Sequence, residues 1–139
     1  QSKILNEDRN INTAGSVLLV DDDAVLLEIM EHVLQNLGFK VFVAGSGKEA
    51  VVLLQKHQDI IDCLITDLSM PDMDGWETLV ALRKIQPDLP AVLSSGYDEK
   101  QAMSGDHDES FQGFLHKPYT KADLNSVLGR ILGEISKNA

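Results

Sequence analysis

Asp67 is the residue in this sequence whose setting most needs a chemical explanation. It ends a nearly uniform apolar run, residues 61–66, and is followed by the turn signals Met70-Pro71 and Asp74-Gly75. An apolar, β-branched run closed by such signals is typical of a strand buried on both faces of a parallel sheet. Ligands of open α/β sheets gather beyond the carboxyl ends of the strands, so the pattern predicts that Asp67 lies at the rim of a site. For this segment alone, a carboxylate that merely caps a loop is the simpler alternative.

Other chemically active residues lie at the ends of other expected strands. The acidic residues Asp21, Asp22 and Asp23 come directly after residues 16–20, Ser95 ends a later run, and Lys117 follows another. Because the carboxyl ends of parallel strands meet at one edge, we expect these residues to share a rim with Asp67. Two carboxylates about 4 Å apart repel by roughly 4 kcal/mol at an effective dielectric constant of about 20. The cluster therefore requires a cation.

The types of these side chains favour one cation and one reaction. Hard oxygen ligands without His or thiolate suit Mg²⁺, with Mn²⁺ as a laboratory substitute. A carboxylate beside Mg²⁺ is also a nucleophile toward phosphorus, which gives an aspartyl-phosphate. Lys117 would offer an ammonium to the transferring group, and Ser95 a hydroxyl to a phosphoryl oxygen. Taken singly, Asp23 and Ser95 can be helix caps and Lys117 a solvated strand end, so their expected common edge carries the argument.

Hydrophobic spacing predicts the elements that must position this chemistry. Strands are expected at residues 16–20, 39–44, 61–66, 90–95 and 111–116. Helices are expected at 24–37, from a capping box of Ser46 and Glu49 to residue 57, from 76 to Pro87, weakly at 98–106, and over a stripe from 124 to 135. Strands alternating with helices predict a single doubly wound α/β domain with a five-stranded parallel sheet.

Length and charge limit the classes of protein that fit. The 139 residues suffice for one domain, expected at 16–139, and the polar residues 1–15 suggest a linker or disordered tail. A net charge of -10 disfavours direct contact with nucleic acid or an anionic membrane. The lone Cys63 excludes a disulfide framework within the chain, and no long apolar run or leader is present, so a cytoplasmic location is expected.

Four motifs, in order along the chain, resemble the phosphoacceptor receiver domain of two-component signalling proteins. They are Val17-Leu-Leu-Val-Asp21-Asp22-Asp23, Asp67-Leu-Ser-Met-Pro71-Asp-Met-Asp-Gly75, Leu93-Ser-Ser95-Gly and Phe114-Leu-His-Lys117-Pro118. The likeness spans about residues 16–134 and implies a flavodoxin-like sheet with strand order 2-1-3-4-5. It also implies that Asp67 receives a phosphoryl group from the phosphohistidine of a histidine kinase or histidine phosphotransfer domain.

The resemblance further implies roles for individual residues. The implied Mg²⁺ ligands are Asp22, Asp67 and the backbone carbonyl of Ser69, with Asp21 assisting through water. The implied switch pair is Ser95 and Phe114, and the Lys117–Pro118 peptide bond is expected to be cis. Ser94 is an alternative switch hydroxyl, but counting five residues from Pro90 favours Ser95. Phe114 stands where some members carry Tyr, so this switch would work by packing alone.

Two functional hypotheses from different classes remain at this point. In the first hypothesis, phosphorylation changes how strongly the face formed by the fourth helix, fifth strand and fifth helix binds a partner or a second copy of the domain. The domain itself is then no enzyme beyond slow self-dephosphorylation, although its parent chain could be a membrane-anchored hybrid sensor histidine kinase, as the missing initial Met suggests. The alternative is a Mg²⁺-dependent phosphatase that passes through an aspartyl-phosphate. Such enzymes place a general acid two residues after the nucleophile, where this chain has Ser69.

Overall fold

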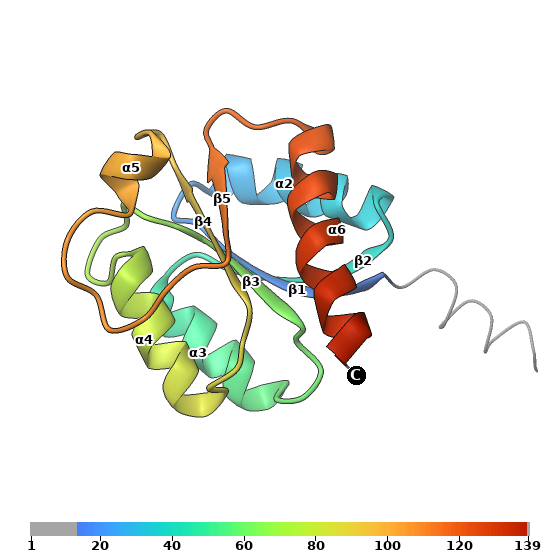
Figure 1. Cartoon of the computed structure of the whole chain (residues 1–139), viewed down its shortest axis with the longest axis horizontal. Helices are drawn as coiled ribbons and strands as arrows, with labels where there is room; N and C mark the ends of the chain where they lie inside the picture. Colours follow the sequence, from blue (N-terminus) through green and yellow to red (C-terminus); the bar gives the residue numbers. More distant parts are fainter. Residues whose placement is uncertain (1–13, 139) are drawn as a thin grey trace, which may run out of the picture.

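The computed structural model describes residues 14–138, in which five strands alternate with helices (Figure 1). The strands are β1 (Gly15–Val20), β2 (Phe39–Ala44), β3 (Cys63–Asp67), β4 (Ala91–Ser95) and β5 (Gly113–His116). The helices are α2 (Ala24–Asn36), α3 (Gly47–Lys56), α4 (Gly75–Ile85), α5 (Glu99–Ala102) and α6 (Lys121–Asn138). The predicted fourth and fifth helices are therefore α5 and α6.

All strand pairs are parallel, and the sheet has the order β2-β1-β3-β4-β5. This confirms the predicted doubly wound, flavodoxin-like architecture. In the register, Val20 pairs with Thr66 and Asp67 pairs with Ser94, so the carboxyl ends of β1, β3 and β4 lie side by side. The fold thus brings together the strand ends that carry the candidate chemistry.

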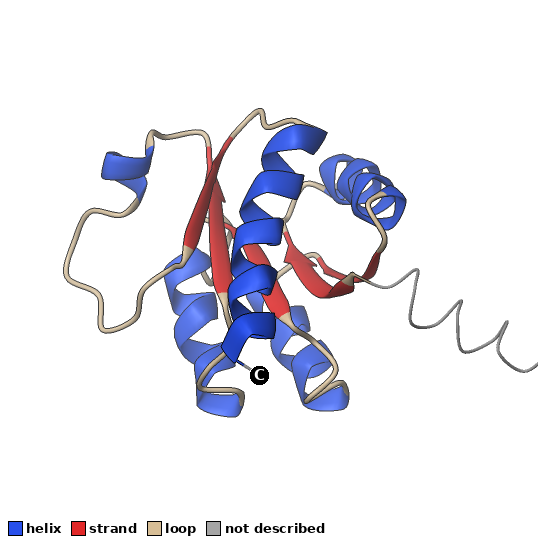
Figure 2. Ribbon diagram, turned by 45° about the vertical axis from the view of Figure 1, so that its right-hand side comes forward, coloured by secondary structure: helices blue, strands red, loops and turns tan. Residues whose placement is uncertain are grey.

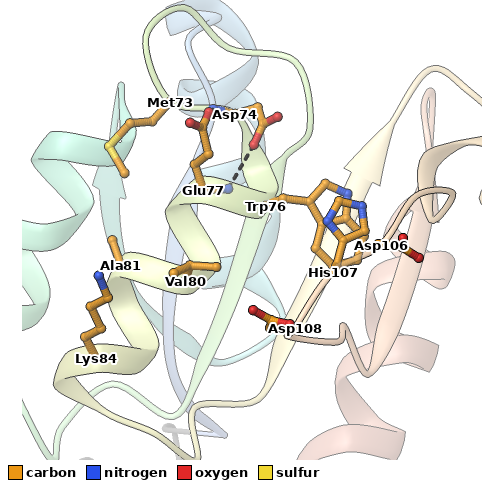
Figure 3. Close-up of a pocket in the computed structure, with 10 residues that line it drawn as sticks. All are labelled: Met73, Asp74, Trp76, Glu77, Val80, Ala81, Lys84, Asp106, His107 and Asp108. Atoms are coloured by element: carbon orange, nitrogen blue, oxygen red, sulfur yellow. Dashed lines mark hydrogen bonds between the residues drawn. The ribbon is translucent and has the colours of Figure 1, made fainter.

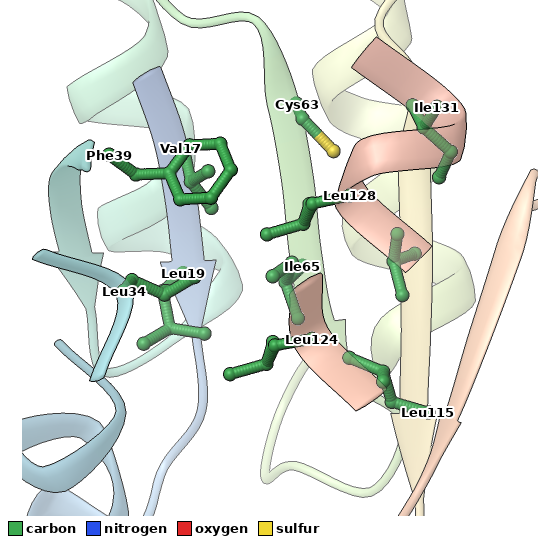
Figure 4. Close-up of a cluster of buried hydrophobic side chains, with 11 residues drawn as sticks. Val17, Leu19, Leu34, Phe39, Cys63, Ile65, Leu115, Leu124, Leu128 and Ile131 are labelled. Carbon is green, nitrogen blue, oxygen red and sulfur yellow. The ribbon is translucent and has the colours of Figure 1, made fainter. Parts of the chain in front are cut away.

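Alternating side chains of the strands build a core on each face of the sheet. On one face, Val17, Ile65 and Val92 pack with Leu34 of α2 and Leu128 of α6 (Figure 4). The opposite cluster contains Leu18 and Leu64 together with buried leucines of α3 and α4. Helices consequently cover both faces of the sheet (Figure 2). A β-branched and leucine-rich strand composition is what burial on both faces requires.

Cys63 belongs to the first of these clusters and is completely buried. Burial raises the pKa of its thiol to about 12, and the nearby charge of Asp62 adds to this shift. The side chain remains a neutral thiol at physiological pH and acts as a small apolar core residue, as the sequence suggests.

The helices α2 and α3 begin at the predicted caps Asp23 and Ser46, although the capping box predicted at Ser46 is incomplete. Asp23 caps α2 by accepting hydrogen bonds at Oδ1 from the amides of Val25 and Leu26, both at 3.1 Å. The Ser46 hydroxyl accepts from the Glu49 amide at 3.1 Å, but the Glu49 carboxylate bonds to the amide of Gly45 at 2.9 Å. The predicted reciprocal capping box at Ser46 is therefore wrong, because the Glu49 carboxylate reaches one residue further back.

Several predicted boundaries were too generous. Helix α5 ends at Ala102, and the predicted extension to residue 106 is absent; Gly105, within that extension, adopts a left-handed φ of 102° that a helix cannot contain. Strand β3 starts at Cys63, since the Ile61 amide still bonds to the carbonyl of His57 at 3.3 Å. Strand β5 starts at Gly113, two residues after the predicted start.

At the N-terminal end, the predicted tail covers residues 1–15. Residues 1–13 lie outside the described part of the chain, and Gly15 is already the first residue of β1. Among the helices of residues 14–138, none combines the length and apolar character needed to cross a bilayer.

Candidate functional site

The candidate site lies at the carboxyl edge of the sheet, where hydrogen bonds between strands continue past the strand ends. The amide of Asp21 donates to the carbonyl of Ala44 at 3.1 Å, and the amide of Lys117 donates to the carbonyl of Ser95 at 2.8 Å. Asp67 is the last residue of β3. The backbones of these three site residues are therefore held by the sheet itself.

Lys117 joins two of the buried carboxylates. Its Nζ lies 2.8 Å from Asp21 Oδ2 and 2.9 Å from Asp67 Oδ1. The Lys117 side chain keeps 24% of its surface exposed, whereas that of Asp67 keeps 9%. Charge-assisted hydrogen bonds of this length are among the stronger polar interactions in proteins.

Asp21, Asp22 and Asp67 form what we call the acidic cluster. Each offers a carboxylate oxygen, and these oxygens all lie within 4.8 Å of one another. Asp21 and Asp67 are buried, whereas Asp22 is exposed. Asp21 is engaged at both oxygens, because Oδ1 also accepts from the amide of Asp23 at 3.0 Å. Three carboxylates facing one ammonium leave the cluster with an excess of negative charge.

Burial and neighbouring charges perturb the pKa values of the two paired residues. Burial raises the pKa of the Asp67 carboxyl; the charges of Asp21 and Asp22 add to this shift, and the hydrogen bond and charge of Lys117 oppose it. For Lys117, burial acts to lower the pKa, but the hydrogen bonds and charges of Asp21 and Asp67 outweigh it, and its pKa is raised. Lys117 is thus a permanent cation in the site, while ionised Asp67 is under electrostatic strain.

Gly75, the first residue of α4, passes directly behind Asp67. A Cβ atom on Gly75 would lie 2.6 Å from the Asp67 carbonyl oxygen and 2.9 Å from Leu93 Cδ1. The amide of Gly75 donates to the Leu68 carbonyl at 2.8 Å, which closes the loop after β3 onto the start of the helix. Only glycine fits this close approach of backbone to backbone.

The candidate switch residues lie on one side of the sheet. Because side chains alternate along a strand, Ser95 shares its face with Leu93, and Phe114 is the register partner of Leu93. Ser94 faces the other way and pairs with Asp67 in the register. The Ser95 hydroxyl oxygen accepts a hydrogen bond from the Tyr97 amide at 3.0 Å.

The remaining predicted positions are also located. Ser69 lies in the loop two residues beyond the end of β3, with an exposed side chain. The Lys117–Pro118 peptide bond is cis, which confirms that prediction.

Sequence reasoning missed Tyr119, which packs on the core beneath the site. With Leu26 and Met30 of α2 it lines a cavity of about 330 Å³ that also borders Lys117. Burial raises the pKa of its hydroxyl to about 12, and the charge of Lys117 opposes this shift. Its place immediately after Lys117-Pro118 was the available signal.

The fold and the site together define a class: a doubly wound α/β domain with an acidic cluster and a lysine at the carboxyl edge of its sheet. Comparison with known proteins identifies the family. The model of the response regulator receiver domain matches residues 17–129, and the chain belongs to this family. It is accordingly a receiver domain of two-component signalling, a type of phosphoacceptor module, and nothing in the comparisons favours a phosphatase.

Individual relatives support this assignment. The sensor kinase CckA of Brucella abortus is 30% identical over 132 residues, which cover 95% of this chain and 14% of the relative. The rice two-component response regulator ORR24 is 32% identical over 116 residues, covering 84% of this chain and 18% of the relative. The chain thus spans less than a fifth of the length of either relative.

Solved structures agree with the fold. A response regulator receiver domain protein from Clostridium thermocellum superposes with a TM-score of 0.80 at 25% identity, covering 90% of this chain and 99% of that one. The receiver domain of the hybrid histidine kinase CckA gives a TM-score of 0.73 at 28% identity, covering 85% and 99%.

Proposed function

We propose that Asp67 is the phosphoacceptor of this domain and that its donor is the phosphohistidine of a histidine kinase or histidine phosphotransfer domain. The observation that carries the proposal is the position of the Lys117 ammonium, 2.9 Å from Asp67 Oδ1 beside two further carboxylates. In the transfer, a carboxylate oxygen of Asp67 forms a bond to phosphorus while the bond from phosphorus to the imidazole nitrogen breaks. The electron pair of that bond stays on the imidazole.

The donor set of the acidic cluster fits Mg²⁺, with Mn²⁺ as a substitute, because it offers hard oxygen ligands and excess negative charge. Asp22, Asp67 and the carbonyl of Ser69 would hold the ion directly. Asp21 would act through water, in keeping with both of its oxygens being engaged by the amide of Asp23 and by Lys117. When bound, the ion neutralises charge on the phosphoryl oxygens.

Lys117 has a second role once the phosphoryl group has transferred. Formation of the acyl phosphate removes the negative charge from the Asp67 carboxylate, which ends the reason for its ion pair with Lys117. The ammonium then pairs with a phosphoryl oxygen and stays bound to Asp21, 2.8 Å away. Lys117 therefore orients the group without leaving the site.

Ser95 and Phe114 would transmit the effect of Asp67 phosphorylation to the surface of the domain. The Ser95 hydroxyl can donate its proton to a phosphoryl oxygen, which would draw the end of β4 toward the site. Phe114 lines a cavity of about 350 Å³ together with Pro118 and Val127. A change in Phe114 packing would alter the α5–β5–α6 face, through which we propose that the phosphorylated domain binds a partner or a second copy of itself. Light scattering with and without phosphorylation tests for the dimer.

Acyl-phosphate labelling tests the proposed nucleophile. The protein is incubated with acetyl phosphate and Mg²⁺, and the gain of one phosphoryl group is read from the intact mass. We expect Asp67→Asn to abolish the gain, whereas the exposed loop variant Asp72→Asn retains it. Continued labelling of Asp67→Asn would place the nucleophile elsewhere.

The domain would catalyse at most its own slow dephosphorylation; steady hydrolysis of a simple phosphate ester would revive the phosphatase alternative.

Its similarity to a sensor kinase supports an origin in a hybrid histidine kinase, with the domain in the cytoplasm. Its net charge of -10 argues against nucleic acid or an anionic membrane as a direct partner.

A further inference from the structure

A second hollow of the molecule lies away from the acidic cluster. It is an open groove of about 540 Å³ between α4 and residues 103–112, the segment that joins α5 to β5 (Figure 3). We call it the α4 groove. The proposed phosphotransfer does not use it.

Part of the lining on the α4 side of the groove is apolar. Met73, Trp76, Val80 and Ala81 all contribute to it. Val80 is 40% exposed although it lies on a helix whose opposite face is packed into the core. A valine and an indole at one helical turn from each other form a surface that favours contact with apolar side chains.

The rim of the groove is strongly acidic. Asp74 and Glu77 stand at the start of α4, and Asp106 and Asp108 stand on the facing segment (Figure 3). Asp74 and Glu77 each use one oxygen for the capping box of α4, with hydrogen bonds of 2.8 and 3.0 Å. Lys84 is the one ammonium among the residues that line the groove. The rim therefore attracts a cation.

Trp76 of α4 holds part of the segment 103–112, which forms the wall of the groove opposite the helix. Its indole nitrogen donates to the Ala102 carbonyl at 3.3 Å, and its ring stacks on His107 with centroids 3.6 Å apart and planes 3° from parallel. Phe111 meets the same indole edge-on at a centroid distance of 4.8 Å. These contacts hold the segment with Asp106 and Asp108 at a set distance from α4.

Arg83 of α4 holds the end of this segment that precedes β5. Its Nη1 donates to Glu109 Oε1 at 2.9 Å and to the Ser110 carbonyl at 2.8 Å. Its Nη2 donates to Gln112 Oε1 at 2.8 Å and to the Leu89 carbonyl at 2.9 Å. With both ends of the wall bound to α4, the groove is preorganised, and a ligand does not have to order it.

From this geometry we propose that the α4 groove is a docking site for a basic amphipathic segment of a partner protein. Apolar side chains of the segment lie on Trp76 and Val80, and its Lys or Arg residues pair with Asp106 and Asp108. The acidic rim repels nucleic acid and anionic lipid, which leaves a cationic protein segment as the occupant that matches both lining and charge. Docking does not require phosphorylation of Asp67, so its test stands apart from the proposed function.

The probe is a synthetic peptide of about 14 residues with Leu and Lys at helical spacing and without Trp. Binding is followed by the emission of Trp76, the sole tryptophan of the chain, and by calorimetry. A peptide with Glu in place of Lys is the charge control. We expect the basic peptide to bind and the acidic peptide not to bind.

Two matched pairs of variants locate the binding. Val80→Glu, in the groove, is compared with Val52→Glu at a 50% exposed valine on α3. The double variant Asp106→Asn/Asp108→Asn is compared with Asp59→Asn/Asp88→Asn, which removes the same charge from exposed sites elsewhere. We expect about tenfold weaker binding for the groove variant of each pair and no more than about twofold for its control.

Thermal melts establish that the variants fold. If Val80→Glu proves unstable, the aspartate pair decides the question, since those side chains are exposed. Equal weakening in both members of a pair would show general attraction to an acidic chain and would overturn the proposal. No binding by the unaltered protein, or no effect of the groove variants, would overturn it as well.

Discussion

Lys117 Nζ lies 2.9 Å from Asp67 Oδ1, although the two residues belong to different strand ends 50 positions apart in the chain. This ion pair places a fixed cation against the proposed nucleophile before any phosphoryl group arrives. It compensates only part of the repulsion within the acidic cluster, because Asp21 shares the same ammonium. The free energy of unfolding should therefore depend on the charge of Asp67.

The first prediction concerns pH. Since the folded pKa of Asp67 is raised, its contribution to stability is most favourable below the unfolded value of about 3.9 and is lost as pH rises through the folded value. The raised pKa of Lys117 has its effect near or above pH 10, outside this window. In metal-free buffer, Asp67→Asn should raise the melting temperature at pH 7 and leave it nearly unchanged at about pH 3.5. A lower melting temperature of Asp67→Asn at pH 7 would contradict the assigned strain.

The second prediction concerns the metal. A ligand at ten times its dissociation constant stabilises a fold by about 1.4 kcal/mol, so Mg²⁺ should raise the melting temperature by several degrees. Asp22→Asn should remove most of this rise, because Asp22 is a proposed direct ligand of the ion in the acidic cluster. Asp88→Asn, an exposed aspartate elsewhere, is the control and should keep it. The same Mg²⁺-induced shift in both variants would separate the ion from the acidic cluster.

The third prediction distinguishes the two adjacent serines. Ser95→Ala should leave acyl-phosphate labelling intact but suppress the hydrogen-exchange changes of the α5–β5–α6 face that follow labelling. Ser94→Ala should leave both responses in place, because alternation along β4 turns the Ser94 side chain to the face of the sheet opposite Ser95 and Phe114. If Ser94→Ala alone suppressed the response, Ser94 would be the switch hydroxyl.

The fourth prediction uses two glycines in helices. In Gly75→Ala the new Cβ would meet the Asp67 carbonyl oxygen at 2.6 Å, so we expect a loss of about 1–3 kcal/mol in the free energy of unfolding. Gly129→Ala, in α6, meets no atom within 4 Å and should gain about 0.5–1 kcal/mol from helix propensity. Urea unfolding measures both. The same change in the free energy of unfolding for both variants would show that the backbone around Asp67 and Gly75 relaxes freely to admit the new Cβ atom.

The fold and most of the site could be predicted from the sequence because both depend on strand ends. Asp67 ends a short apolar run and Lys117 follows the strand predicted at residues 111–116, and the rule that parallel strands end at one edge is enough to bring them together. The alternation of predicted strands and helices along the chain predicted the doubly wound sheet. The strand order, by contrast, came from the resemblance to the family.

The details that could not be predicted depend on contacts between elements. The stack of Trp76 on His107 joins residues 31 positions apart, and the bonds of Arg83 to Glu109 span 26. No local sequence pattern indicates either contact, because both determine the path of a segment without regular secondary structure. The half-formed cap at Ser46 likewise depended on the exact direction of the Glu49 side chain.

Chemical mapping of the phosphoryl group determines whether Asp67 is the phosphoacceptor. After incubation with acetyl phosphate and Mg²⁺, borohydride reduces an aspartyl-phosphate to homoserine, and peptide mass spectrometry locates the converted residue. We expect conversion at position 67 alone, in an amount that falls when Mg²⁺ is chelated. Conversion at another aspartate, with position 67 unchanged, would contradict it.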